Sequence, residues 1–407
     1  MTRLITYYGD DFTGSTDVME ALTCHGVSTV LFTHSPSAQE FAPFAQFEAI
    51  GLAGTSRSQT PAWMEENLPA SFTWLKSLDA KFCHYKVCST FDSSPHMGSI
   101  GRAIDVGLRI FDQEQVELIV GAPQIKRFTF AGHLFAAYQG RIFRIDRHPV
   151  MSVHPVTPMD ESDVLIHLAK QTKAQVHLSD VFDAVSQEAA GEALLALPPA
   201  SLPFVVGSSG VEYALMAAMR KQRRSDFAHV PKVDRLLVIS GSVSPTTERQ
   251  IAYACTHGFT ALSADPLDLA RGNYQALLAE AATLLGQGKS PLIYTASGPA
   301  SDQGDALKDI PAGREQLSKS LGQIAKALVA RFHLKRLVIA GGDTSSHALG
   351  ELEIHALTMR FPLVQTPGSP LCKAYSSHAN FDGLEVALKG GQVGGDDYFV
   401  KLKEGLF

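Results

Sequence analysis

Two adjacent carboxylates, Asp10 and Asp11, follow the first apolar run of the sequence, Leu4 to Tyr8. The residues that come next predict a strand that ends at these carboxylates and a helix that begins at Gly14 to Thr16. Carboxylates at such a position suit hydroxyl binding, coordination of magnesium through water, or removal of a hydroxyl proton during phosphoryl transfer. The alternative is ordinary helix capping by one aspartate beside a solvated neighbour.

Cationic side chains follow two further apolar runs. The stretch "GTSRS" places Arg57 after one predicted strand, and "YKVCSTFDSSP" places Lys86 and Ser89 after another. A guanidinium binds a carboxylate through two hydrogen bonds, whereas a lysine supplies a point charge. An acidic sugar fits this set of side chains, although either cation taken singly is typical of a solvated surface.

A long segment rich in Arg, His and Pro, "RIFRIDRHPVMSVHPVTPMDESD", covers residues 141–163. It has neither helical nor strand periodicity, so we expect an ordered loop. His148 and His154 each precede a proline, which restricts the local backbone. A single loop histidine is more often structural than catalytic.

Two apolar runs of the C-terminal half end in glycine and serine. In "LVISGSVSPTTERQI" the run passes into Ser242 and Ser244, and Pro245 suits the first position of a helix. In "LVIAGGDTSSHAL" the run passes into Gly341 and Gly342 at the next predicted helix start. Glycine lets the backbone approach a ligand closely, and the free N–H groups of a helix N-terminus favour an anion such as phosphate.

Two more turns of the same half have this composition. "TASGPASD", Thr295 to Asp302, follows a strand, and "LKGGQVGGDD", Leu388 to Asp397, is a glycine cluster that could close over a nucleotide. Each turn alone is common in α/β proteins, so their recurrence carries the interpretation. The half has no Walker A sequence, no protein-kinase motif pair and no G-x-G-x-x-G after its strands, which disfavours those nucleotide-binding classes.

Short apolar runs alternate with helical patterns along the whole chain, which is typical of α/β proteins with largely parallel sheets. The basic, polar stretch 221–234 reads as a linker, so we expect domains at residues 1–228 and 229–407. The predicted strands of the first domain are Leu4–Tyr8, Ser28–Phe32, Ala49–Leu52, Phe82–Val87, Glu117–Val120 and Phe204–Val206. Those of the second are Arg235–Gly241, Pro291–Gly298 and Arg336–Asp343.

Composition excludes several classes of function. The 407 residues are 45% hydrophobic and 19% charged, which predicts a globular protein with a sizeable core. A net charge of -6 disfavours nucleic-acid binding, and five scattered cysteines without a C-x-x-C pair support neither a disulfide framework nor a zinc site. No signal peptide and no apolar run of membrane-spanning length is found, so we expect a cytoplasmic protein without a membrane partner.

The sequence resembles the four-carbon acid sugar kinase family, which joins an N-terminal sugar-binding domain to a C-terminal nucleotide-binding domain. The segments that carry the resemblance span nearly the whole chain: "YGDDFTGSTD", "YKVCSTFDSS", "HPVTPMDESD", "GSVSPTTERQI" with "GGDTSSHAL", and "LKGGQVGGDDYF". The branch that acts on 3-oxo-tetronate is most similar through "DDFTGSTD". Many relatives carry D-S-T-L-R-G-N where this chain has "CSTFDSSPHMG", so one arginine of the family pattern is absent.

The resemblance implies two α/β domains, each a mostly parallel sheet flanked by helices, with the active site in the interdomain cleft. It implies phosphorylation of the terminal C4 hydroxyl of a four-carbon sugar acid by ATP with Mg²⁺, most similar to 3-oxo-tetronate kinase; threonate or erythronate is the alternative substrate. Asp11 or Asp10 would orient or deprotonate the hydroxyl. Asp10, Asp11, Arg57, Lys86 and Ser89 would contact the acid, and Ser242, Ser244, Gly341, Gly342, Asp343, Thr344, Ser345, Gly390 and Gly391 would contact ATP.

Other functions stay open at this stage. A non-catalytic sensor that closes on a sugar acid would share the same binding residues and release no ADP. A hydroxy-acid dehydrogenase would need a dinucleotide fingerprint that the sequence lacks. The partners we expect are a small sugar acid and ATP, while the metal ligands and assembly into a homo-oligomer stay open.

Overall fold

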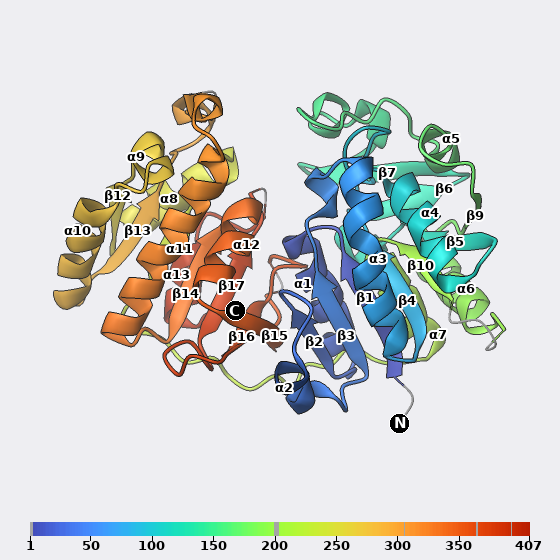
Figure 1. Ribbon diagram of the computed structural model, residues 1–407, viewed down its shortest axis with the longest axis horizontal. Helices are drawn as coiled ribbons and strands as arrows, with labels where there is room; N and C mark the ends of the chain where they lie inside the picture. The colour runs from blue at the N-terminus through green and yellow to red at the C-terminus, as the bar shows by residue number, and fades with distance from the viewer. Residues whose placement is uncertain (1–2, 199–202, 305, 364, 392) are drawn as a thin grey trace. The chain divides into compact units, whose positions relative to one another are not determined.

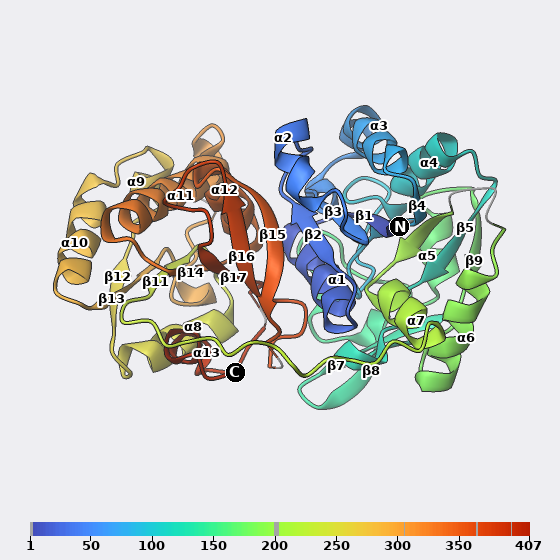
Figure 2. The same ribbon diagram turned by 90° about the horizontal axis from the view of Figure 1, so that it is seen from below.

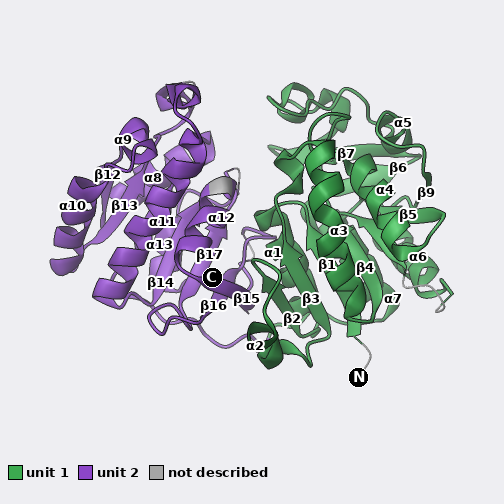
Figure 3. Cartoon of the chain, viewed as in Figure 1, with its two compact units in different colours: residues 1–225 green, residues 226–407 purple. Residues whose placement is uncertain are grey.

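The computed structural model describes residues 3–198, 203–304, 306–363, 365–391 and 393–407. The chain divides into two compact units, Met1–Ser225 and Asp226–Phe407 (Figure 3). The predicted linker, 221–234, contains no helix or strand. The expected domain boundary at residues 228 and 229 falls within this stretch and stays a prediction.

A parallel sheet with the order β2-β3-β1-β4-β10-β5-β9 forms the centre of the first unit. Its inner strands are apolar, as is typical of parallel strands that are covered on both faces, whereas β9 at the edge is partly exposed. The register aligns Gly9 at the end of β1 with Ala53 of β3 and Lys86 of β4, and Lys86 with Gly207 of β10. The segments that follow these strands therefore leave the sheet at one level, where the predicted site residues lie.

Helices cover both faces of this sheet. Figure 2 shows α3 and α4 on one face and α1, α6 and α7 on the other. Large aromatic side chains fill the space between helices and sheet, and Tyr7, Phe72, Tyr85 and Phe204 are buried. The elements of the sheet and its helices are β1 (Arg3–Gly9), α1 (Phe12–Cys24), β2 (Thr29–Phe32), α2 (Ala38–Phe41), β3 (Ala49–Ala53), α3 (Pro61–Ser77), β4 (Ala80–Lys86), α4 (Ile100–Phe111), β5 (Gln115–Ile119), α5 (Val164–Ala169), β9 (Gln175–Leu178), α6 (Ala184–Leu195), β10 (Phe204–Gly207) and α7 (Gly210–Ala218).

A small antiparallel sheet, β6-β7-β8, lies between β5 and α5 in the chain (Figure 1). Its strands are Arg127–Phe130, His133–Tyr138 and Arg141–Arg144, and β8 is followed by short 3₁₀ turns at Ile145–Arg147 and Met151–Val153. The expectation of a loop throughout 141–163 is therefore wrong at its start. Exposed Arg and Ile side chains on β8 give no buried face, so the strand has no apolar alternation to reveal it.

The second unit is built on a sheet with the order β12-β13-β11-β14-β17-β16-β15. The pairs from β12 to β17 are parallel, while β16 pairs antiparallel with β17 and β15. Figure 2 shows α8 and α13 on one face and α9 to α12 on the other. Its elements are β11 (Leu237–Ser240), α8 (Pro245–Cys255), β12 (Phe259–Ser263), α9 (Pro266–Ala270), α10 (Gln275–Gly286), β13 (Ser290–Tyr294), α11 (Gly313–Phe332), β14 (Arg336–Ala340), α12 (Gly342–Glu351), β15 (Ile354–Phe361), β16 (Leu371–Ser376), β17 (Glu385–Lys389) and α13 (Tyr398–Glu404).

The predicted strands of both units are present, with ends that differ by a few residues. The two C-terminal predictions that ran into glycine turns, Pro291–Gly298 and Arg336–Asp343, are too long because the strands stop at Tyr294 and Ala340. The predicted α/β class with mostly parallel sheets is confirmed. None of the helices in the described ranges is long and apolar enough to cross a membrane.

Candidate functional site

Arg57 holds both aspartates of the first predicted site. Its Nε and Nη2 donate to Asp10 Oδ2 and Oδ1 at 3.1 and 2.7 Å, and its Nη1 donates to Asp11 Oδ2 at 2.7 Å. The backbone fixes this arrangement, because the Arg57 amide donates to the Asp10 carbonyl and the Asp10 amide donates to the Lys86 carbonyl. The ends of β1, β3 and β4 thus bring three predicted residues together.

The two interpretations of Asp10 and Asp11, helix capping and a ligand site, each apply to one of the aspartates. Asp11 is the N-cap of α1, since its Oδ1 accepts from the Gly14 amide at 2.6 Å. Asp10 is not the solvated neighbour that the capping interpretation expects, because it is 3% exposed and ion-paired with Arg57. The Asp11 side chain is 30% exposed, so it is the more accessible carboxylate of the two.

Burial and charge shift the protonation of this group. Burial raises the pKa of Asp10 and the neighbouring Asp11 charge adds to the effect, while Arg57 opposes it. Although burial disfavours its charge, Asp10 and Asp11 raise the pKa of Arg57 well above the usual value. Arg57 is therefore a fixed cation that organises the two carboxylates, with the Nε and Nη2 edge fully engaged by Asp10.

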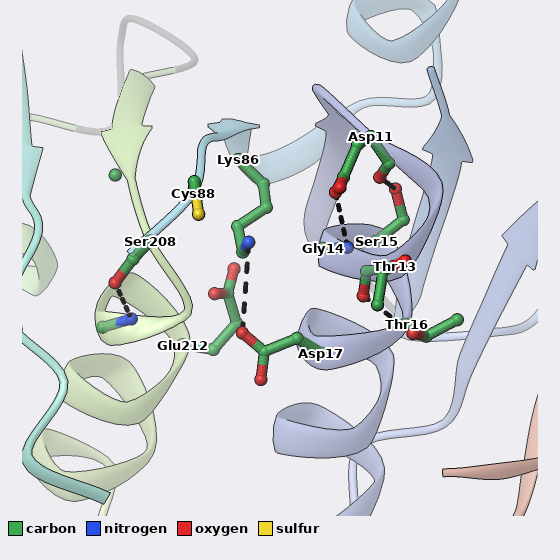
Figure 4. Close-up of polar contacts among 12 residues, drawn as sticks. Asp11, Thr13, Gly14, Ser15, Thr16, Asp17, Lys86, Cys88, Ser208 and Glu212 are labelled. Carbon is green, nitrogen blue, oxygen red and sulfur yellow. Dashed lines mark hydrogen bonds and ion pairs between the residues drawn. The ribbon is translucent and has the colours of Figure 1, made fainter. Parts of the chain in front are cut away.

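Lys86 approaches the same point from β4. A Cβ added at Gly14 would lie 2.5 Å from Asp11 Oδ1 and 2.9 Å from Lys86 Nζ, so the glycine leaves room for these charged groups to converge. Lys86 is 2% exposed, and its Nζ lies 4.0 Å from Asp17 Oδ2. Figure 4 shows its side chain pointing toward Asp17 and Glu212.

Three buried titratable residues around Lys86 were not predicted. Burial raises the pKa of Asp17, although Lys86 opposes this shift, and Asp17 Oδ1 has no hydrogen-bond partner among the described residues. His84 Nδ1 lies 2.7 Å from Glu212 Oε1, and both side chains are fully buried. Since His84 Nε2 must donate to the Gly207 carbonyl at 3.1 Å, Nδ1 and the carboxyl share one proton.

Ser89 after β4 and the two loop histidines after β8 lie outside the charged group around Arg57 and Lys86. Ser89 is half-buried and makes no side-chain hydrogen bond to any described residue, so its role in substrate binding stays a prediction. Nδ1 of His148 accepts from the amides of Val150 and Met151, and Nδ1 of His154 accepts from the Thr157 amide. Both histidines thereby order the loop in which they lie.

The second unit has a pocket at the carboxyl ends of its strands. It brings together three of the predicted turns, since Gly241, Thr295 and Thr344 all line it. A Cβ at Gly241 would lie 2.2 Å from Thr344 Oγ1, so two turns approach each other only because glycine stands there. Gly341 has φ of 118°, which an L side chain rarely adopts, and it turns the chain from β14 into α12. The rest of the lining is Val243, Pro266, Ala296, Asp302, Gln303, Gly304, Leu307, Arg314, Leu317 and Ser318.

The predicted serines and the Gly390–Gly391 turn form a second polar group in this unit. Ser244 caps α8 by accepting from the Thr246 amide at 3.1 Å, and Ser242 Oγ lies 2.9 Å from Thr247 Oγ1. A Cβ at Gly391 would lie 3.1 Å from the Ser244 Cβ, which shows how closely the glycine turn packs on the serine turn. These predicted residues lie together.

Three more of the residues predicted to contact ATP lie at the start of α12, namely Gly342, Asp343 and Ser345. The Ser345 hydroxyl is buried and donates to the Gly341 carbonyl at 2.7 Å, which places it within the helix turn. The side chain of Asp343 lies outside the described residues. A Cβ at Gly342 would meet no atom within 4 Å, so this position leaves open space above the turn.

Lys389, at the end of β17, was not predicted although it directly precedes the glycine pair. Its buried Nζ donates to Thr247 Oγ1 at 2.9 Å and to the carbonyls of Gly390 and Gly391 at 2.9 and 3.3 Å. No carboxylate of the described residues forms an ion pair with it, and burial lowers its pKa to about 7. The lysine thus binds the backbone of the glycine turn without a carboxylate to stabilise its charge.

The described residues of the two units contain no preformed metal cage. No group of three or more His, Cys, Asp or Glu side chains in the described ranges is arranged to hold a metal ion. Magnesium that enters with nucleotide phosphates needs only one or two protein carboxylates. Asp302 is the carboxylate that lines the pocket of the second unit, so the residues present fit a magnesium ion carried by a nucleotide.

Comparisons with known proteins agree with this division of chemistry. Residues 5–242 match the sugar-binding N-terminal domain family, and residues 237–399 match the nucleotide-binding C-terminal domain family. The chain is 37% identical to 3-oxo-isoapionate kinase of Paraburkholderia graminis, over 99% of this chain and 94% of that protein. It is 30% identical to 3-oxo-tetronate kinase of Cupriavidus necator, over 97% and 95% of the two chains.

Solved structures share the fold at lower sequence identity. A crystal structure from Salmonella typhimurium LT2 superposes with a TM-score of 0.76 at 23% identity, covering 99% of each chain. The Haemophilus influenzae protein HI1011 gives 0.71 at 22% identity, over 99% of this chain and 100% of that one. Both domain families match in the predicted order, and the similarity to the two kinases extends over nearly the whole chain. This protein therefore belongs to the four-carbon acid sugar kinase family.

Proposed function

We propose that the protein transfers the γ-phosphoryl group of ATP to the terminal C4 hydroxyl of 3-oxo-tetronate. The observation that carries this proposal is the full-length similarity to kinases whose names share a 3-oxo sugar acid. Such an acid has a carboxylate, a ketone two carbons away and a terminal primary hydroxyl as phosphoryl acceptor. The charged group of the first unit and the glycine-rich pocket of the second supply the two kinds of binding that this reaction needs.

Asp11 is the residue that would orient or deprotonate the acceptor hydroxyl. It is the more exposed carboxylate of the pair, whereas both oxygens of Asp10 are hydrogen-bonded to Arg57. Arg57 fixes the carboxylates, and the buried Lys86 adds positive charge at the same point. Phosphoryl transfer depends mainly on positioning and charge stabilisation, which is what a rigid charged group of this kind provides.

The second unit would bind ATP through backbone amides, hydroxyls and Lys389. Gly241, Gly341 and the start of α12 would lie along the phosphates, with Ser242, Ser244 and the Gly390–Gly391 turn completing the site. Mg²⁺ would neutralise phosphate charge when it is bound, and Asp302 would hold it. Helix N-termini and N–H groups at glycine turns are well suited to anionic phosphates.

3-oxo-isoapionate is the second candidate substrate, because the relative that carries this name is 37% identical. Threonate and erythronate, which lack the ketone, remain the alternatives from the sequence. A homo-oligomer and a cytoplasmic location stay predictions.

The test is a kinase assay on the purified chain with ATP and magnesium. ADP release is measured with 3-oxo-tetronate, 3-oxo-isoapionate and the D and L forms of threonate and erythronate, and ³¹P NMR identifies the phosphorylated carbon. We expect turnover with a 3-oxo acid and phosphate on its terminal carbon. Binding of an acid without any ADP release would instead establish the sensor alternative, and turnover only with threonate or erythronate would contradict the 3-oxo specificity.

A further inference from the structure

Arg127, the first residue of β6, has a guanidinium edge that meets no acceptor in the part of the chain that the structure describes. Its Nη1 donates to the carbonyls of Ile125 and Lys126, each at 3.2 Å. Neither Nε nor Nη2 donates to an acceptor of the described residues, and the Nε atom is buried. This edge presents two parallel N–H groups, which is the geometry that a carboxylate accepts.

Three other arginines of the chain have a carboxylate at that edge. Nε and Nη2 of Arg57 donate to Asp10 at 3.1 and 2.7 Å. The same two atoms of Arg144 donate to Asp146 at 2.7 and 2.6 Å, and those of Arg336 donate to Glu385 at 2.8 and 2.5 Å. Arg127 lacks the carboxylate that these three arginines have.

The missing carboxylate has an energetic consequence. Burial lowers the pKa of Arg127, because its cation loses water without gaining an ion pair. Removing water from an uncompensated charge opposes folding. The first-unit residues outside the described ranges, 1–2 and 199–202, contain no Asp or Glu. No carboxylate of the first unit therefore occupies this edge, and the carboxylate of a ligand matches its geometry.

The backbone holds Arg127 beside the carboxyl end of β5. The Ala122 amide donates to the Arg127 carbonyl at 2.9 Å, and the Arg127 amide donates to the Ala122 carbonyl at 3.2 Å. Asp17 and the Cys88 thiol interact electrostatically with Arg127, and Cys88 interacts in the same way with Arg57. Arg127 thus faces the end of the sheet where the charged group of the first unit lies.

We propose that Arg127 binds the carboxylate of the sugar acid and sets the preference of the enzyme for acids over neutral sugars. This inference rests on the proposed function and replaces the role that the sequence suggested for Arg57. The Arg57 edge is occupied by Asp10, and Lys86 faces Asp17. Arg127 is the cation of this group whose Nε and Nη2 edge meets no acceptor among the described residues.

The test compares Arg127→Gln with Arg144→Gln, a matched control from the same small sheet whose edge is filled by Asp146. Steady-state ADP release is measured with 3-oxo-tetronate and with erythrulose, in which a hydroxymethyl group replaces the carboxylate. We expect Arg127→Gln to raise KM for the acid on the order of 10- to 100-fold, the usual effect of losing a charged hydrogen-bonded pair. Its kcat/KM for erythrulose should change less than about threefold.

Thermal stability separates a binding role of Arg127 from a structural one, because replacing a structural arginine would lower Tm. The Tm of ligand-free Arg127→Gln should equal or exceed that of the wild type, because a buried charge without a partner is removed. The Arg144→Gln control should keep its KM for the acid. An unchanged KM in Arg127→Gln, an equal loss with acid and erythrulose, or a variant that fails to fold would each overturn the proposal.

The two proposals fail in different ways. If the wild type releases no ADP with any acid, the proposed function fails, and calorimetry of 3-oxo-tetronate binding to wild type and Arg127→Gln without ATP still measures the carboxylate contact. If the wild type is an active kinase and Arg127→Lys and Arg127→Gln both bind the acid as tightly as it does, only the inference about Arg127 fails.

Discussion

The two units place polar groups at the same position, the carboxyl ends of parallel strands, but with opposite chemistry. In the first unit ionised side chains neutralise one another, as Arg57 does with Asp10 and Asp11. In the second unit glycines and hydroxyls line a pocket with little acidic charge, and Lys389 binds the Gly390 and Gly391 carbonyls. The first arrangement suits moving a proton from a hydroxyl, and the second suits holding an anion.

The largest expected effect is on the carboxylates of the first unit. Asp11→Asn should lower turnover on the order of 100-fold or more, because the acceptor hydroxyl loses its charged partner. Asparagine still caps α1, so the fold and ATP affinity should stay near those of the wild type. ADP release measures the first expectation, and calorimetry with ATP measures the second.

Asp146→Asn is the matched control, since this carboxylate also pairs with an arginine, Arg144, but forms no hydrogen bond or ion pair with Arg57, Asp10 or Asp11. It should keep its turnover. Equal losses in the two variants would mean that any arginine-paired aspartate of the first unit matters only for structure, and the contrast between the units would lose its chemical meaning.

Arg57→Gln should be the most destabilising single change at the site. Without the Arg57 guanidinium, the carboxylate of Asp10, which is 3% exposed, has no ion-pair partner. Breaking a buried ion pair lowers the free energy of unfolding by about 3 kcal/mol. Urea unfolding measures the change in the free energy of unfolding. Arg109→Gln, which breaks an exposed pair with Glu65, should cost less than about 1 kcal/mol. A similar cost for both variants would show that the buried pair contributes no more than a surface one.

The sequence predicts the strands and the turns that follow them, because each short apolar run between helical patterns marks a buried parallel strand. From this alone Asp10, Asp11 and Arg57 could be assigned to one edge of the sheet. Their mutual ion pairing depends on the register of β1 against β3, which no local pattern specifies. The edge of Arg127 that lacks a partner among the described residues could not be predicted from the sequence, because it depends on which acceptors lie near the guanidinium after folding.

Some charged residues of the site are missed because no local sequence pattern marks them. Lys389 stands beside the quoted glycine pair, yet nothing in the sequence shows that β17 buries it without a carboxylate. Asp17 and Glu212 lie on helices with ordinary polar neighbours, and only the packing of α1 and α7 brings both of them toward Lys86 (Figure 4). Charges that act together across packed helices are therefore found by structure and not by spacing.

A smaller effect is expected from the shape of the pocket in the second unit. Gly241→Ala would place a Cβ 2.2 Å from Thr344 Oγ1, so the two turns must separate. We expect ATP affinity to fall about tenfold, as overpacking typically costs 1–3 kcal/mol, while acid binding stays unchanged. Calorimetry with each ligand measures both. Gly350→Ala is the control, because a Cβ there meets no atom within 4 Å. If Gly241→Ala weakened acid binding instead, the roles of the two units would be reversed.

The smallest expected effect concerns Lys389, whose pKa is strongly lowered by burial at the glycine turn of the second unit. Its pKa is about 7 in the folded chain and 10.5 in the unfolded chain, so between these values the unfolded chain binds more protons. Stability must then rise with pH across that interval, by up to about 1.4 kcal/mol per pH unit, and level off below pH 7. We expect this rise in the wild type relative to Lys389→Met, measured by urea unfolding at several pH values, and no such difference for the exposed Lys373→Met. A flat difference between wild type and Lys389→Met would mean that Thr247 and the Gly390 and Gly391 carbonyls stabilise the ammonium ion fully, so that the lysine stays charged throughout and serves the pocket as a permanent cation.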